Sequence, residues 1–233
     1  MVLDAPFANV VSEAVPKQLA RSNAIEGEPP VGDGDYCNQE AGDYYSTVFV
    51  QCVNLHENSA PMQKLVLDKD LARAVADTAG EAGKLRLYHD HYLEKPAWGS
   101  ATNLHHDNQL DPWWTNASHM LWIALDDTTM QNGALLFLLG THKQAVYQKT
   151  EMNGGFGGDN TIGGLLRRRP EWSAIEPVVV AARAGDAILI NGMVAHGAGP
   201  NLTPRKRRVA SVLYVGDVEN LTFSPSSPGA LHS

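Results

Sequence analysis

The segment Leu104-His105-His106-Asp107-Asn108 contains the most specific chemistry in this chain. On a β-strand, residues i and i+2 point to the same face, so a strand here would present an imidazole from His105 and a carboxylate from Asp107 together, with His106 on the other face. The alternative register, His106 with Asn108, supplies no carboxylate. A His-x-Asp triplet alone is weak evidence for a metal site, because histidine is so often only a satisfied polar residue.

A second segment far along the chain supplies the missing ligand. His196-Gly197-Ala198-Gly199-Pro200-Asn201 forms a Gly-rich loop after an apolar strand, and its glycines allow the backbone to turn tightly beside a metal. Two histidines and one carboxylate on one face of a metal, with the other positions open, is the ligand set of non-haem iron(II) oxygenases. The sequence therefore predicts that His105, Asp107 and His196 bind one Fe(2+) ion.

Length and charge narrow the class of protein. The chain has 233 residues, which suits one domain, and a formal net charge of −8. No basic face is available to neutralise phosphates, so a nucleic-acid partner is disfavoured. The one basic run, Arg205-Lys206-Arg207-Arg208, is short and leads into an apolar strand.

The sequence shows neither a secretion signal nor a membrane span. The first residues lack a basic n-region, and no apolar run approaches the length of a transmembrane helix. The two cysteines, Cys37 and Cys52, do not make a disulfide framework, so reduced thiols are the default expectation. These features predict a cytoplasmic protein with no membrane partner, and they leave the oligomeric state open.

The pattern of short apolar runs separated by Gly or Pro predicts a mainly β protein with helical cover. One amphipathic helix is expected over Pro61 to Ala79, ended near Gly80. The fold class that fits is a double-stranded β-helix, the cupin-like jelly roll. The expected strands are Tyr44 to Val53, Leu85 to Leu93, Ser118 to Leu125, Gly133 to Leu139, Val178 to Ala182, Ala187 to Ile190 and Val209 to Val215.

We expect a single domain over residues 1–233. It carries a loop-rich extension at 1–43, a Gly-rich insertion at 154–164 with a short helical piece near Leu165 to Arg168, and a frayed tail at 224–233. Near its end, Arg207 precedes the apolar strand Val209 to Val215. A strand that carries one arginine inward at its start can place a guanidinium behind the metal, where it would form two parallel bonds with a carboxylate.

Taken together, these segments resemble the phytanoyl-CoA dioxygenase (PhyH-like) family of iron(II)/2-oxoglutarate-dependent oxygenases. The resemblance covers roughly residues 88–215, and the order and spacing of five segments match. These are His105-His106-Asp107, Trp122-Ile123-Ala124-Leu125-Asp126, Asn132-Gly133-Ala134-Leu135 running to Gly140-Thr141-His142-Lys143, Gly185-Asp186, and His196-Gly197-x-Gly199-x-Asn201 with Arg207.

The resemblance implies a jelly-roll core with His105, Asp107 and His196 as the iron ligands. It implies that Arg207 pairs with the distal carboxylate of 2-oxoglutarate and that Trp122 lines the co-substrate pocket. The implied activity converts 2-oxoglutarate and O2 to succinate and CO2 while it oxidises a C–H bond of a small organic metabolite. Related halogenases replace the acidic ligand with Gly or Ala, so Asp107 implies hydroxylation rather than halogenation.

Two positions depart from the family pattern. The family often has Ser two residues after the distal histidine, where it helps the arginine to hold 2-oxoglutarate, and this chain has Ala198 there. The hydrogen bond of that serine is therefore absent or supplied elsewhere. The family often has Pro before the Gly-Thr/Ser-His motif, and this chain has Leu139.

Five further residues are candidates for substrate contact. His89 and His91 share a strand face and would line the pocket, or simply form a polar strand beside it. Lys95 precedes Pro96, as in many relatives, and is either a co-substrate contact or an ordinary surface lysine. Trp113 and Trp114 follow the metal segment in a loop, a position that suits substrate contact, and simple packing is the alternative.

Two other functions fit parts of the pattern. A cupin-type metal enzyme that does not use 2-oxoglutarate would build a histidine-rich site from His89, His91, His105 and His196, and Arg207 with Trp122 argues against it. A metal-free jelly-roll binding module would have no need for three metal ligands. Succinate formation separates the first alternative from an oxygenase, and iron content separates the second.

Overall fold

The computed structural model describes residues 48–81, 85–109, 113–144, 164–216 and 222–223. The expected extension at 1–43, the tail at 224–233 and nearly all of the insertion at 154–164 lie outside these ranges. In the described part of the chain, no helix is long and apolar enough to cross a membrane.

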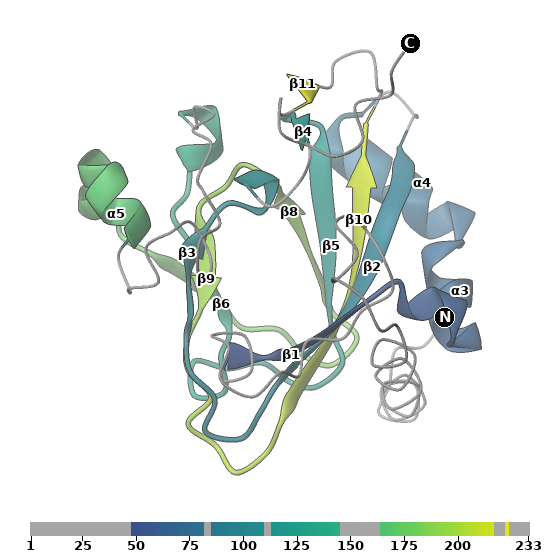
Figure 1. The fold of residues 1–233 in the computed structure, drawn as a ribbon, viewed down its shortest axis with the longest axis horizontal. Helices are drawn as coiled ribbons and strands as arrows, with labels where there is room; N and C mark the ends of the chain where they lie inside the picture. The colour runs from purple at the N-terminus through teal and green to yellow at the C-terminus, as the bar shows by residue number, and fades with distance from the viewer. Residues whose placement is uncertain (1–47, 82–84, 110–112, 145–163, 217–221, 224–233) are drawn as a thin grey trace, which may run out of the picture.

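Two antiparallel sheets form the body of the protein (Figure 1). The larger sheet has five strands in the order β1 (Val50–Val53), β2 (Arg86–Lys95), β10 (Arg207–Val215), β5 (Ser118–Ala124) and β8 (Ala187–Asn191). The smaller has four, in the order β3 (Thr102–His105), β9 (His196–Ala198), β6 (Leu135–Phe137) and β7 (Val178–Val180). A separate pair joins β4 (Trp113–Trp114) to β11 (Thr222–Phe223). This architecture confirms the expected jelly roll.

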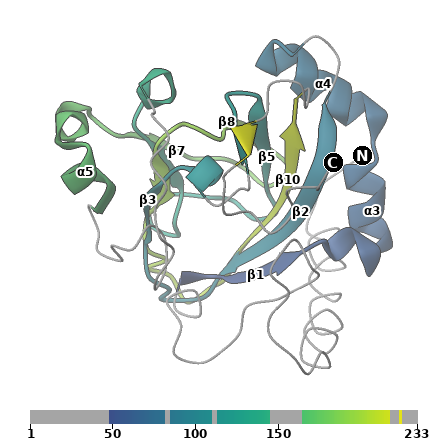
Figure 2. The ribbon, with the colours of Figure 1, turned by 45° about the horizontal axis from the view of Figure 1, so that its top comes forward.

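Strand alternation divides the larger sheet into an inner and an outer face. On β5, Met120 and Trp122 belong to a buried cluster that also contains Leu135 and Phe137 of the smaller sheet, so this cluster fills the space between the sheets. Leu121 and Ile123 point the other way, into a cluster with helical side chains. The helices α3 (Ala60–Val66) and α4 (Lys69–Ala79) cover this outer face, as both ribbon views show (Figures 1 and 2).

The prediction of a single helix over Pro61 to Ala79 is wrong, because the chain forms the two helices α3 and α4 there. Asp68 interrupts the run: its Oδ1 accepts hydrogen bonds from the backbone N–H groups of Asp70 and Leu71, both at 3.0 Å, and so caps the start of α4. Helix α4 ends as expected at Gly80, whose φ of 73° is readily adopted by glycine.

Several element boundaries also differ from the sequence-based expectation. The first expected strand is described only as β1, the strand expected over Gly133 to Leu139 is reduced to β6, and His196–Ala198 forms strand β9 rather than a loop. The segment after β3 is not extended but turns into a 3-10 helix, η2. The remaining short helices are η1 (Leu55–Glu57), η2 (Asp107–Gln109), η3 (Thr141–Lys143), α5 (Gly164–Arg168) and η5 (Pro170–Ala174).

The cysteines also differ from expectation. Cys52 is fully buried in β1 and is disulfide-bonded, whereas the sequence suggested free thiols. The only other cysteine in the sequence, Cys37, lies outside the described residues.

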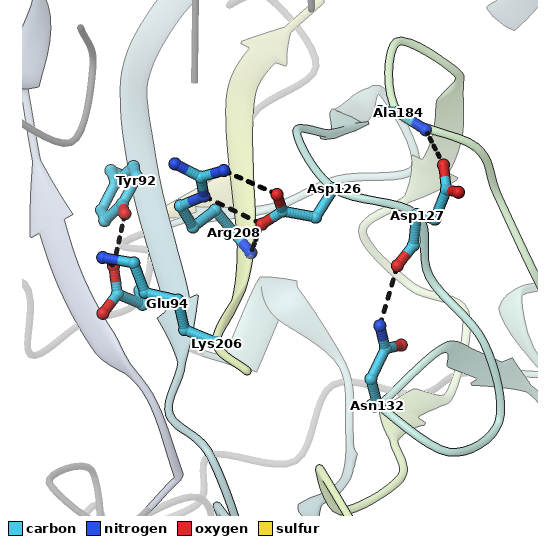
Figure 3. Close-up of polar contacts among 8 residues, drawn as sticks. All are labelled: Tyr92, Glu94, Asp126, Asp127, Asn132, Ala184, Lys206 and Arg208. Atoms are coloured by element: carbon cyan, nitrogen blue, oxygen red, sulfur yellow. Dashed lines mark hydrogen bonds and ion pairs between the residues drawn. The ribbon is translucent and has the colours of Figure 1, made fainter. Parts of the chain in front are cut away.

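Hydrogen bonds of Asp126 and Asp127 fix the turn that follows β5 (Figure 3). Arg208 donates to Asp126 through Nε at 2.9 Å and through Nη2 at 2.7 Å, which is the two-bond pairing that guanidinium and carboxylate favour. Asp127 accepts from the Ala184 N–H at 2.8 Å through its carboxylate and from the Asn132 side chain at 2.8 Å through its carbonyl. The guanidinium of Arg208 is therefore paired with Asp126 on the outer side of β10.

Asn201, the last residue of the His-Gly-x-Gly-x-Asn motif, ties two loops together. It is fully buried, and its Nδ2 donates to the carbonyls of Pro96 at 2.8 Å and Arg205 at 2.7 Å. Its Oδ1 accepts from the backbone N–H of Thr203 at 3.1 Å and from the Thr203 hydroxyl at 2.8 Å. The motif asparagine thus joins the loop before β3 to the loop before β10.

Replacing Asn201 with alanine should destabilise the protein by about 2–3 kcal/mol, because it leaves buried carbonyls without donors. Urea unfolding of the wild type and the variant measures the difference. Asn116→Ala is the matched control: its side chain is exposed, and the change should stay within about 0.5 kcal/mol. Equal unfolding midpoints for Asn201→Ala and wild type would contradict this role.

Candidate metal centre and co-substrate site

The structure brings His105, Asp107 and His196 together between the two sheets. One potential ligand atom from each lies within 4.8 Å of the others, and all three side chains are buried. Asp107 Oδ1 lies 3.5 Å from His105 Nε2 and 3.6 Å from His196 Nε2. These separations place three ligand atoms around one point. Among the described residues, this is the only group of His, Cys, Asp and Glu side chains that could hold a metal.

Both histidines are oriented by their own backbone. His105 Nδ1 lies 2.8 Å from the Asn103 carbonyl, and His196 Nδ1 lies 3.0 Å from the Val194 carbonyl. A carbonyl only accepts, so each Nδ1 carries the proton and each Nε2 presents a lone pair toward Asp107. Such carbonyl partners are usual for metal-binding histidines, because they select the tautomer and fix the ring.

Asp107 completes the candidate metal group, but its carboxylate is oriented by a different backbone conformation from the strand that we expected. The strand β3 ends at His105, and Asp107 begins the 3-10 helix η2, so a turn rather than strand alternation aims its carboxylate. His106 still points away from the group, where its ring meets Trp172 edge-on at 5.4 Å between centroids. Burial lowers the pKa of His106 to about 3, so the imidazole is neutral.

The electrostatics of the group favour a bound cation. Burial alone would raise the pKa of Asp107, but His196 and His105 lower it to about 2, so the carboxylate is ionised. Burial lowers the pKa of His196. Asp107 Oδ2 is buried and has no hydrogen-bond partner among the described residues. A divalent metal would satisfy this orphaned oxygen and both imidazole lone pairs, so the residues fit an iron(II) ion.

Two residues of the sequence motifs, Thr141 and Asn108, form hydrogen bonds that hold the segments carrying the metal ligands. Thr141 Oγ1 donates to the Leu138 carbonyl at 2.8 Å and accepts from the Ala195 N–H at 2.9 Å, next to His196. Asn108 donates from its backbone to the Gly192 carbonyl at 3.0 Å, which ties η2 to the turn that leads to β9. His142 stands beside Thr141 in η3 but does not belong to the metal group.

Arg207 is the first residue of β10, and its guanidinium lies over the Trp122 ring at 5.5 Å from the centroid. The side chain is only 4% exposed, and its Nε has no hydrogen-bond partner among the described residues. Burial lowers the pKa of Arg207 to about 10, so the group is still a cation at neutral pH. The adjacent Arg208 is paired with the carboxylate of Asp126, whereas Arg207 carries a buried positive charge to which no acid among the described residues is bonded.

Lys95 is not the surface lysine that one interpretation allowed. It is fully buried in β2 and is the register partner of Arg207 in β10. Its Nζ donates to the carbonyls of Ser100 at 2.6 Å and Val48 at 3.4 Å, and to the Thr102 hydroxyl at 3.3 Å. Gly133 leaves room for it: a Cβ there would lie 2.8 Å from Lys95 Cδ, and its φ of +94° suits glycine.

His89 and His91 lie on β2 with their rings 4.3 Å apart, and both interact electrostatically with Asp107. Burial lowers the pKa of His89 to about 4 and that of His91 well below its usual value. Both are therefore neutral at pH 7. His89 is buried and neither of its ring nitrogens has a hydrogen-bond partner among the described residues. Neither histidine belongs to the metal group.

Ser211 was missed by the sequence interpretation. It is the register partner of His91 on one side and of Trp122 on the other, and its buried hydroxyl has no partner among the described residues. The sequence did contain a signal for it: Ser211 lies four residues after Arg207, and residues four apart on a strand point to the same face. Trp113 and Trp114 form β4, but their side chains lie outside what the structure describes.

A family model for phytanoyl-CoA dioxygenase (PhyH) matches residues 38–209 of the 233-residue chain. The chain belongs to the phytanoyl-CoA dioxygenase family. The match includes every residue of the candidate metal group together with Trp122 and Arg207.

Curated proteins match this chain at low identity. Multifunctional dioxygenase prhA of Penicillium brasilianum is 27% identical over 161 residues, which are 64% of this chain and 49% of that protein. Phytanoyl-CoA dioxygenase of Arabidopsis thaliana is 27% identical, over 68% of this chain and 53% of that protein. The chain spans about half the length of these two relatives.

Solved structures share the fold. The non-haem alpha-ketoglutarate-dependent carbocyclase SnoK from nogalamycin biosynthesis aligns with a TM-score of 0.68 at 21% identity, over 94% of this chain and 77% of that one. EctD from S. alaskensis, solved with 2-oxoglutarate and 5-hydroxyectoine, aligns with a TM-score of 0.62 at 19% identity, over 91% of this chain and 68% of that one. A further EctD structure contains bound iron. This PhyH-family chain therefore shares its jelly-roll fold with SnoK and EctD.

Proposed function

We propose that this PhyH-family protein is a non-haem Fe(2+)/2-oxoglutarate-dependent dioxygenase that hydroxylates an unactivated C–H bond of a small organic metabolite. The observation that carries the proposal is the pairing of two features between the same sheets. One is a buried group of two imidazoles and one carboxylate with an orphaned oxygen. The other is a buried arginine to which no acid is bonded in the part of the chain that the structure describes.

His105, Asp107 and His196 would hold the metal, and Arg207 would hold the distal carboxylate of 2-oxoglutarate with Trp122 beneath the guanidinium. When bound, iron(II) with 2-oxoglutarate and O2 supplies the oxidising chemistry, in which 2-oxoglutarate becomes succinate and CO2. The protein orients the two imidazoles through the carbonyls of Asn103 and Val194. It also keeps the site poor in water, because the metal group and Arg207 are all buried.

The substrate would lie beside the histidine pair of β2. His89 and His91 are neutral, so each offers one N–H donor and one acceptor nitrogen rather than a charge. These groups suit hydroxyl, carbonyl or amide groups of a substrate. Trp113 and Trp114 remain candidates for substrate contact by their position in β4, next to the segment that carries Asp107. Lys95 faces Arg207 instead, at the co-substrate end.

Hydroxylation is favoured within the family because Asp107 is an acid. Its carboxylate points at both imidazoles, so the position that a halogenase leaves open for halide is filled. The structural neighbours include a carbocyclase and an epimerase, as their descriptions state. Product analysis therefore decides between hydroxylation and those outcomes.

The cupin-type alternative loses support from the geometry. It needs His89 and His91 to join His105 and His196 around a metal, and neither joins the metal group. In a metal-free binding module, Asp107 Oδ2 and the ring nitrogens of His89 would stay without hydrogen-bond partners among the described residues. Unpaired buried polar atoms destabilise a fold, and such a module would gain no function from them. The assay that separates all three functions is oxygen-dependent conversion of 2-oxoglutarate to succinate with iron(II), run against a panel of small metabolites. Iron-dependent succinate formation supports the oxygenase, and its absence under every condition contradicts it.

Anaerobic addition of 2-oxoglutarate to the iron(II)-loaded protein should give a weak visible charge-transfer band, because the keto acid chelates the metal at its open positions. Absorption spectroscopy under argon measures it. Glutarate is the control, since it has the same two carboxylates but no keto group and should give no band. Fully loaded iron with no band on 2-oxoglutarate addition would count against chelation.

A further inference from the structure

The carboxylate of Asp107 is carried by a short element that is weak by itself. Strand β3 ends at His105, and Asp107 begins η2, a 3-10 helix of three residues. Short 3-10 helices have poorer hydrogen-bond geometry than α-helices, so such a turn gains much of its rigidity from neighbouring segments. Contacts outside η2 must therefore fix the direction in which Asp107 points at His105 and His196.

Asn108, the next residue, ties η2 to two other segments. Its side chain is fully buried, and its Nδ2 donates to the carbonyl of Thr115 at 2.5 Å, in the loop between β4 and β5. Its backbone N–H donates to the carbonyl of Gly192 at 3.0 Å, in the turn between β8 and β9. Strand β9 begins at His196, so Asn108 connects the acidic ligand to the segment that leads to the second imidazole.

Gly192 leaves room for the side chain of Asn108. A Cβ on Gly192 would lie 2.3 Å from Asn108 Oδ1 and 2.9 Å from Ser118 Oγ, so a larger residue there would have to displace the amide. Asn108 Oδ1 and Ser118 Oγ are both buried and have no hydrogen-bond partner among the described residues. An unpaired buried amide oxygen is destabilising, so stability alone does not account for an asparagine at this position.

We propose that Asn108 is a positioning residue for the metal centre. Its buried carboxamide, held between Thr115 and Gly192, fixes η2 so that the Asp107 carboxylate is presented to the metal together with both imidazoles. Asn108 acts through the backbone that it shares with Asp107. The inference rests on the proposed metal site and concerns how the chain aims the one acidic ligand of that group.

The test is calorimetric binding of manganese(II) to the metal-free protein, together with the visible spectrum of the cobalt(II)-loaded protein. Asn108→Ala removes the carboxamide and should weaken manganese(II) binding by roughly 10- to 100-fold, the usual loss when a partner that orients a ligand is removed. The cobalt(II) spectrum should change as well, because a misplaced carboxylate alters the coordination of the ion.

Gly192→Ala tests the same contact from the other side, since its methyl group would collide with Asn108 Oδ1. It should weaken manganese(II) binding to a similar degree as Asn108→Ala. The double variant should bind no more weakly than Asn108→Ala alone, because the amide that the methyl group would displace is already absent.

Asn191→Ala is the matched control. Asn191 joins the same two segments, because its Nδ2 donates to the Asn116 carbonyl at 2.8 Å and its Oδ1 accepts from the Met193 N–H at 3.0 Å. Neither of these bonds involves η2. Asn191→Ala should therefore bind manganese(II) and give the cobalt(II) spectrum of the wild type, even where urea unfolding shows that the variant is destabilised.

The outcomes separate this inference from the proposed function. If wild type binds manganese(II) no better than His105→Ala, the proposed function fails. If wild type binds the metal and Asn108→Ala binds it equally well with the same cobalt(II) spectrum, the positioning role is overturned while the function stands. The role is also overturned if Asn191→Ala loses as much affinity as Asn108→Ala, or if the losses of Asn108→Ala and Gly192→Ala multiply in the double variant. Where Asn108→Ala does not fold, Gly192→Ala compared with Asn191→Ala decides in the same way.

Discussion

Asp107→Ala should abolish turnover and strip the protein of iron. The substitution removes the only carboxylate in the metal group, so two imidazoles would be left to hold a divalent cation. His105→Ala removes one of the two imidazoles and should have the same consequence. Loss of an outer hydrogen-bond partner typically costs about 10- to 100-fold in metal affinity, and loss of a ligand should cost more. Iron retained after anaerobic loading and desalting, together with succinate formation, measures both effects.

His106→Ala is the matched control for the ligand variants. It is the neighbour of both ligands in sequence, but its ring packs edge-on against Trp172, on the side away from the metal group. We expect iron to stay bound and at least part of the turnover to remain, with some loss of stability from the missing ring contact. The opposite pattern, iron lost in His106→Ala and kept in His105→Ala, would show that the ligand set is misassigned.

Arg207→Ala should weaken 2-oxoglutarate binding by about 2–5 kcal/mol, the scale of truncating one partner of a buried charged pair. That is a loss of roughly 30-fold to several thousandfold in affinity. The physical reason is that the guanidinium is buried and no acid of the described ranges is bonded to it, so a carboxylate is its natural partner. Iron binding should survive, because Arg207 is no metal ligand. Calorimetry with the manganese(II)-loaded protein measures the 2-oxoglutarate affinity, and iron retained after anaerobic loading and desalting measures the metal binding.

Arg208→Ala tests whether any arginine in this strand would serve. It removes the adjacent guanidinium, which forms two hydrogen bonds with Asp126 on the other face of β10. Affinity for 2-oxoglutarate should be unchanged, although the ion pair with Asp126 is lost. Unchanged affinity in Arg207→Ala, or an equal loss in both variants, would remove Arg207 from the site and with it the main reason to set aside a cupin-type enzyme.

The chemistry of the candidate site could be read from residue identity and order. His105, Asp107, His196 and Arg207 were singled out from the sequence, and the structure places them between the same two sheets. The family assignment and the jelly-roll core are confirmed. The split of the expected helix at Asp68 was also within reach, because an aspartate before a new helical run is a common N-cap.

Other features depended on how distant segments meet. Strand alternation was expected to aim Asp107, but the chain leaves β3 at His105 and a 3-10 turn aims it instead. The local sequence around Lys95 does not tell whether this side chain is buried, since a lysine before a proline occurs both in the interior and on the surface of proteins. Only the pairing of β2 with β10 places it against Arg207.

The sequence by itself determined the ligand types, their order and the alternating pattern that makes two sheets, because these depend on side-chain chemistry and on the period of a strand. The tertiary structure alone decided that Thr102 faces Ala198 and that Ser211 lies between His91 and Trp122. It also decided that Arg208 is bonded to Asp126, whereas Arg207 is bonded to no acid among the described residues. The first two facts are pairings between strands far apart in sequence. Such pairings are set by the register of the whole sheet, which no single segment encodes.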